Sequence, residues 1–105
     1  NYVKDAQRTE AKGAIGAIVT AEQAYYMKSP NLNPGQPATY TDLPTLKDPA
    51  INLVDIRDAE QKWDIVIDNI STTTYTVKAT YRTDPTIKVM YEYVQGSGGT
   101  FSDDF

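Results

Sequence analysis

Apolar residues recur with a helical period over the first 28 residues. From Tyr2 to Lys28 the chain has no proline and is rich in alanine, lysine, glutamine and glutamate, which favour a helix. The pair Ser29-Pro30 predicts the end of that helix. At 1.5 Å per residue the helix is about 40 Å long, more than a domain of this size needs to cover its sheet. We therefore expect one end of the helix to project.

Two adjacent faces of this helix are apolar when the residues are spaced at roughly 100°. Large side chains form the face that we expect to pack on a sheet: Ala11, Ile15, Ile18, Val19, Tyr25 and Tyr26. The second face carries mostly small residues: Val3, Ala6, Ala14, Ala17, Ala21 and Ala24. A surface helix needs only one apolar stripe, so this small-residue face predicts close approach of another subunit. The alternative is that the alanines reflect helix propensity on a solvated face.

Three residues do not fit an ordinary surface helix. Gly13 and Gly16 each destabilise a helix by up to about 1 kcal/mol relative to alanine, so they indicate a bend or a tight contact. Glu22 falls within the large-residue face, where a carboxylate is unexpected. A polar pocket, a contact with a neighbour and the edge of the sheet all remain open as its environment.

Residues 29–61 form a predicted connector that five prolines interrupt. We expect its middle to be a loop, and a connector of this length without regular structure is often functional. Its apolar residues should dock it on the domain: Tyr40, Leu43, Leu46, Ile51, Leu53, Val54 and Ile56.

After Lys62 the apolar period changes to two. Alternating runs at 63–67, 75–81 and 87–93 predict strands of an antiparallel sheet with one wet face. Residues 95–105, with three glycines, are expected to form a flexible tail unless Phe101 and Phe105 pin it.

The predicted fold is therefore a single α+β domain over residues 1–105, in which one long N-terminal helix packs on an antiparallel sheet of three to four strands. Its parts are a helix over 1–28, an αβ-loop over 29–61, a sheet over 62–94 and a tail over 95–105.

Composition excludes several chemistries. The chain has no histidine and no cysteine, so the commonest general base, thiol nucleophiles, disulfides and the usual zinc ligands are missing. Asp64 and Asp68 lie about 13 Å apart along one predicted strand, too far for a glycosidase pair, and are taken as surface charge. We therefore predict no catalytic, cofactor or metal site and no enzyme activity.

Charge is divided unevenly along the chain. Residues 1–28 carry four basic and three acidic side chains, whereas residues 29–105 carry six basic and eleven acidic ones, a net charge of −5. An acidic body repels phosphate backbones, so we expect no nucleic acid to bind the isolated domain.

Lys4, Arg8 and Lys12 recur every four residues and form a basic stripe on the predicted helix. Like charges at this spacing repel, and we expect no compensating partner on the same helix face. A neighbouring subunit's acidic body would then supply the partner and set orientation. A solvated stripe, or one lying near anionic lipid headgroups, is the alternative.

One long helix, a loop and an antiparallel sheet resemble the type IV pilin fold, and the opening residues strengthen this likeness. The run from Asn1 to Lys12, Ala17-Ile18 and the stretch from Ala21 to Tyr26 are similar to the segment that follows the hydrophobic N-terminus of these subunits. The resemblance covers about 26 residues closely; beyond them only the order of elements agrees.

The resemblance implies an upstream apolar half-helix that anchors the precursor in the inner membrane and later packs in the filament centre. A prepilin peptidase would cleave and N-methylate the chain on that upstream segment, so the processing residues have no counterpart in this sequence. It implies no cofactor. Many family members close their C-terminal region with a disulfide, which this cysteine-free chain cannot form.

Three functions follow as expectations. The first is a structural subunit of a type IV pilus for adhesion, motility or DNA uptake, located in an extracellular filament or the periplasm, with identical or related pilin subunits and the pilus or secretion assembly machinery as partners. The second is a pseudopilin of a type II secretion system. The major subunit of such a system usually binds calcium near its C-terminus. Here Ser102-Asp103-Asp104 offers only a few of the six to eight oxygen ligands that calcium needs, so we do not expect that site. The third is a free carbohydrate- or protein-binding module.

Overall fold

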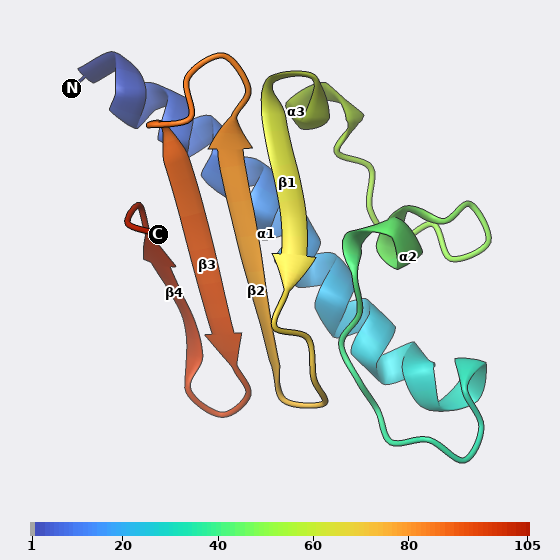
Figure 1. Ribbon diagram of the computed structural model, residues 1–105. Helices are drawn as coiled ribbons and strands as arrows, with labels where there is room; N and C mark the ends of the chain where they lie inside the picture. Colours follow the sequence, from blue (N-terminus) through green and yellow to red (C-terminus); the bar gives the residue numbers. More distant parts are fainter. Residues whose placement is uncertain (1) are drawn as a thin grey trace.

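A computed structural model describes residues 2–105 and divides them into three helices and four strands (Figure 1). The elements in chain order are α1 (Tyr2–Leu32), α2 (Leu43–Lys47), α3 (Arg57–Lys62), β1 (Trp63–Asp68), β2 (Thr74–Tyr81), β3 (Lys88–Val94) and β4 (Gly98–Ser102). The predicted α+β class, with one long N-terminal helix and an antiparallel sheet, is confirmed.

The four strands form one sheet in the order β1-β2-β3-β4, and every neighbouring pair is antiparallel. Ile65 of β1 lies opposite Ala79 of β2, and Val77 of β2 lies opposite Tyr91 of β3. All four residues point to the same side because side chains alternate along a strand. The strands predicted from the two-residue period are confirmed, with boundaries shifted by about one residue.

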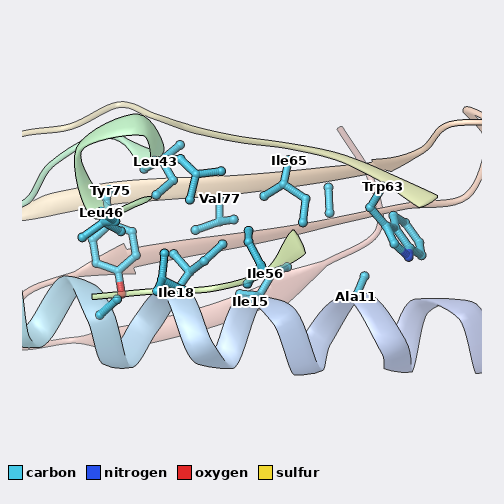
Figure 2. Close-up of a cluster of buried hydrophobic side chains, with 14 of the residues drawn as sticks. Ala11, Ile15, Ile18, Leu43, Leu46, Ile56, Trp63, Ile65, Tyr75 and Val77 are labelled. Atoms are coloured by element: carbon cyan, nitrogen blue, oxygen red, sulfur yellow. The ribbon is translucent and has the colours of Figure 1, made fainter. Parts of the chain in front are cut away.

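The core lies between α1 and one face of the sheet, which the helix crosses diagonally (Figure 1). Ala11, Ile15 and Ile18 are fully buried on the helix, and Trp63 and Val77 are fully buried on the strands (Figure 2). Tyr25 is also buried, while Val19 and Tyr26 are partly buried against this cluster. The predicted large-residue face is therefore the packing face.

The helix does not end at Ser29-Pro30, and that prediction is wrong. Proline has no N–H, so Pro30 leaves the carbonyl of Tyr26 without its usual helical partner. The Ser29 hydroxyl donates a hydrogen bond to that carbonyl at 3.0 Å, and the N–H of Asn33 donates to the Ser29 carbonyl at 2.9 Å. The serine thus replaces the missing bond, and α1 continues to Leu32.

The connector also contains regular structure that the sequence analysis did not predict. Asp42 caps α2 by accepting a hydrogen bond from the N–H of Thr45 at 3.0 Å, and Pro44 occupies the first turn, where its missing N–H is harmless. The last part of the predicted loop forms α3, which leads directly into β1. The expected loop is confirmed for residues 33–42 and 48–56, and α2 is the short helix between them.

The C-terminal segment is pinned rather than a flexible tail. Gly98–Ser102 pairs with β3 as β4, and Phe101 lies against Tyr91 with ring centroids 4.9 Å apart. The chain then folds back so that the ring of Phe105 lies 4.8 Å from Lys88 Nζ and 5.9 Å from Lys78 Nζ. Strand pairing, aromatic packing and cation–π contacts therefore hold this cysteine-free C-terminal segment on the sheet.

Replacing Ile18 with aspartate should unfold much of the protein. Ile18 is fully buried, so Ile18→Asp places a charge in an apolar core and should destabilise the fold by at least about 3 kcal/mol. Ala17→Asp is the matched control, because Ala17 directly precedes Ile18 on the same helix and is exposed. Thermal unfolding by circular dichroism measures both, and equal melting temperatures would contradict the packing described here.

Gly99 is needed for the pairing of β4. A Cβ built at this position would collide with the ring of Tyr91, so Gly99→Ala should displace either β4 or that tyrosine. We expect hydrogen exchange of β4 amides to accelerate at least about tenfold, a loss of about 1.4 kcal/mol of local stability. Gly16→Ala is the control, since its Cβ would meet nothing within 4 Å. Unchanged protection of β4 in Gly99→Ala would mean that the Tyr91 ring moves aside and that the pairing of β4 does not need Gly99.

Candidate functional site

The small-residue face of α1 forms one wall of a groove of about 670 Å³. On this wall the helix contributes Glu10, Gly13, Ala14 and Ala17. The opposite wall comes from α3 and the residues on either side of its start: Asp55, Ile56, Arg57, Asp58, Ala59, Gln61 and Lys62. We call this feature the α1–α3 groove. Because three of its four helix residues carry a methyl group or no side chain, another backbone could approach α1 closely here.

Ion pairs lie along the rim of the α1–α3 groove. Lys62 Nζ reaches across to Glu10 Oε1 at 3.7 Å, and Arg57 pairs with Asp55 at 2.8 Å. The hydrogen bonds from Arg57 lower the pKa of the Asp55 carboxyl below its ordinary value. Exposed pairs of this kind add little to stability. The groove therefore has a small, apolar helix wall and a charged rim.

Of the predicted interface residues on the small-residue face, the structure leaves all but one at least partly accessible. Ala14 and Ala17 line the groove, Ala6 is exposed, and Val3 is 63% exposed. Ala24 is half-buried farther along the same side of the helix.

Ala21 is a correction to the predicted interface. It is only 2% exposed and belongs to the domain's own core, so it is not accessible to a neighbour. It belongs to the buried cluster that also contains Leu43 and Leu46 of α2, which packs against α1.

The basic stripe has partners within its own chain, so the expectation that the helix offers none is wrong. Arg8 forms an ion pair with Asp5 one turn earlier at 3.2 Å and lies 3.8 Å from Asp103, near β4. Lys12 Nζ lies 5.3 Å from the ring centroid of Phe101. Lys4 Nζ donates to the hydroxyl of Thr86 at 3.5 Å. These contacts connect the first half of α1 to the β3–β4 side of the sheet, and a role in subunit orientation stays a prediction.

The wall formed by α3 was missed in the sequence analysis. Asp58, Ala59 and Gln61 showed no apolar period or motif, and only the docking of the connector brings them opposite Ala14 and Ala17. The sequence carried only an indirect signal for this wall. Apolar residues such as Val54 and Ile56 predicted that the connector docks on the domain, and both are buried in the structure.

The described residues do not assemble a metal centre. No group of three or more acidic side chains gathers within residues 2–105 in a way that would hold an ion. At the acidic C-terminal segment, Asp103 faces Arg8, and the Ser102 hydroxyl bonds to the backbone of Asp104. Asp68 pairs with Lys78 at 3.1 Å on the outer face of the sheet.

A scan of protein families, a search of curated proteins and a search of solved structures each found no match to this chain. Within residues 2–105, no helix combines the length and apolar content that a membrane span requires. The functional inference therefore depends on the geometry of α1 and its groove.

Replacing Gly13 with alanine should stabilise the domain. A Cβ at Gly13 would meet nothing within 4 Å, so Gly13→Ala gains helix propensity without a clash, worth about 0.5–1 kcal/mol. The midpoint of urea unfolding should rise accordingly. Gly96→Ala is the contrasting variant. The backbone φ of Gly96 is +89°, which disfavours a side chain, so this substitution should lower the midpoint. A lower midpoint for Gly13→Ala would mean that this glycine is required inside the domain itself.

Proposed function

We propose that this chain is the globular part of a filament subunit of the type IV pilin kind. The observation that carries the proposal is the division of α1 into two faces. One face is buried against the sheet, and the other exposes Ala6, Gly13 and Ala17, of which Gly13 and Ala17 line the α1–α3 groove. A helix that served only its own domain would need only one apolar stripe, and alanine on the solvated side would add helix propensity alone.

Small residues suit a contact between helices. They let two backbones approach to the short end of the usual range of about 8–10 Å between axes, so that many weak contacts form along the helix. The groove beside them gives the contact a second wall. A surface on one subunit that meets a different surface on the next generates a ring or an open filament by repetition.

The rest of the proposal follows the likeness to type IV pilins. An upstream apolar segment would supply the centre of the filament and anchor the precursor in the inner membrane, and the sheet domain would form the outer layer. The partners are then identical or related subunits together with the assembly machinery, and the location is an extracellular filament or the periplasm. A type II secretion pseudopilus would use the same helix contact and is the nearest alternative.

A binding module is the alternative of another class. The connector does form a second hollow of about 530 Å³ next to α2 and α3, but its charged residues include the paired Lys47 and Glu60, 2.7 Å apart. No aromatic side chain lines it to offer a stacking surface. The exposed helix face is therefore the stronger basis for a function.

Filament formation by the full-length protein, with its upstream segment present, tests the proposal. Ala17→Leu fills the α1–α3 groove with a good helix former, so we expect the domain to fold and the yield of filaments to fall at least about tenfold. Gln23→Leu is the matched control on an exposed position of the same helix, and its yield should equal that of the wild type. Electron microscopy and mass spectrometry of sheared filaments give the readout.

Two outcomes would contradict different parts of this proposal. Absence of filaments containing the wild-type subunit, under conditions in which the assembly machinery makes filaments from other subunits, would contradict the filament function. Equal filament yields for Ala17→Leu and the wild type would contradict the role of the groove.

A further inference from the structure

Glu22 is fully buried within the domain although it carries an ionisable carboxyl. It lies on α1, and its Oε1 accepts a hydrogen bond from the N–H of Thr41 at 3.0 Å. Its Oε2 has no hydrogen-bond partner among the described residues. Thr41 directly precedes Asp42, the residue that caps α2. One carboxyl therefore ties the long helix to the point where α2 begins.

A second polar contact holds the same part of the connector. The hydroxyl of Ser29, buried seven residues after Glu22 on α1, accepts a hydrogen bond from the N–H of Thr39 at 3.0 Å. Between the two ties, the ring of Tyr40 stacks on Tyr26 with centroids 4.8 Å apart. We call residues 39–41 the latch segment, because α1 contacts all three of them. The segment also touches the sheet side, where the Tyr40 N–H donates to the Ser71 carbonyl at 3.3 Å and the Tyr40 ring lies against Tyr75, so these contacts break as well when it is released.

The charges around Glu22 oppose its ionisation. The carboxylate of Asp42 on the connector disfavours a negative charge on Glu22, and a charged Glu22 in turn disfavours ionisation of the Tyr75 phenol on β2. No ion pair found in the described part of the chain includes Glu22. Burial raises the pKa of the Glu22 carboxyl from 4.5 to about 8. The hydrogen bond from the Thr41 N–H favours the ionised form and offsets part of this rise, and the nearby Asp42 carboxylate adds a smaller increase.

The neighbouring phenols do not titrate in the same pH range. Burial raises the pKa of Tyr40 to about 12 and raises that of Tyr75 above its ordinary value. Glu22 is therefore the group that changes charge near pH 8 at this contact.

We propose that Glu22 is a pH-sensitive latch: its protonated carboxyl holds the latch segment and α2 on α1, and its deprotonation releases them while α1 and the sheet stay folded. Ionisation would place a negative charge beside Asp42 with no cation to pair it. The opened segment lets water reach the carboxylate, which relieves that cost. Release exposes Tyr40, Leu43 and Leu46, which belong to the buried cluster, whereas Ile15, Ile18 and Val77 stay between α1 and the sheet.

The direction of the pH effect follows from the raised pKa. Below about pH 4.5 the carboxyl is protonated whether the segment is docked or released, so docking is strongest there. Between about 4.5 and 8 the released form ionises first, so docking weakens as the pH rises. Above about pH 8 both forms are ionised and docking reaches its lowest, constant level.

Hydrogen exchange of the 105-residue chain, read by NMR from pH 5 to 9 and corrected for intrinsic rates, tests the latch. The protection of the Thr41 amide should fall by up to about tenfold per pH unit until near pH 8 and then level off. In Glu22→Gln the amide oxygen can accept the same hydrogen bond without charge, so its protection should not depend on pH. Glu92→Gln, at an exposed position on β3, is the control and should behave like the wild type.

Exchange at Val77 in β2 separates local release from unfolding of the whole domain. The latch predicts that Thr41 opens with a smaller free energy than Val77 at every pH above 5. Equal opening free energies at Thr41 and Val77 would overturn the proposal. So would a protection of Thr41 that does not change with pH in the wild type, or one that still changes with pH in Glu22→Gln. If Glu22→Gln does not fold, the carboxyl ¹³C shift of Glu22 in the wild type decides: a titration midpoint near 8 supports the latch, and one near 4.5 overturns it.

Discussion

The contact between one face of α1 and the inner face of the sheet is the interaction on which the other features depend. A domain of 105 residues buries a modest share of its surface, and the isolated helix would be marginal in water. Ile15 and Ile18 against Trp63 and Val77 therefore fix which way the helix faces (Figure 2). Once that rotation is fixed, Ala17 must face away from the sheet and Glu22 must face inward.

The connector is held by a different kind of contact. Its apolar residues, such as Leu46 and Ile56, bury surface without specifying direction, whereas the side chains of Glu22 and Ser29 each bind one particular backbone N–H. Burying such polar groups is favourable only when their hydrogen bonds form. These bonds therefore give the connector one position on α1, and that position places α3 opposite Ala17 to complete the α1–α3 groove.

Much of the fold was predictable because its signals are local. The helical period placed Ile15 and Ile18 in the core, and the two-residue period placed Ile65 and Val77. The end of α1 was not predictable from Pro30, because the compensating bond comes from the Ser29 side chain. Only one wall of the α1–α3 groove was predictable. The helical period places Ala14 and Ala17 on the exposed side of α1, but the position of the second wall, α3, depends on how the connector docks. β4 escaped prediction because glycine and Phe101 give no alternating pattern there.

The order of the elements has a consequence for how the chain folds during its synthesis. The sheet is a simple meander in which each strand pairs with its neighbours in sequence, so it can form from local contacts. Among the described elements α1 is made first, yet its partner β3 follows only after α2, α3, β1 and β2. Its apolar face must therefore remain uncovered until most of the chain has emerged, and we expect the nascent protein to be most prone to aggregation, and most dependent on a chaperone or a membrane surface, during that interval.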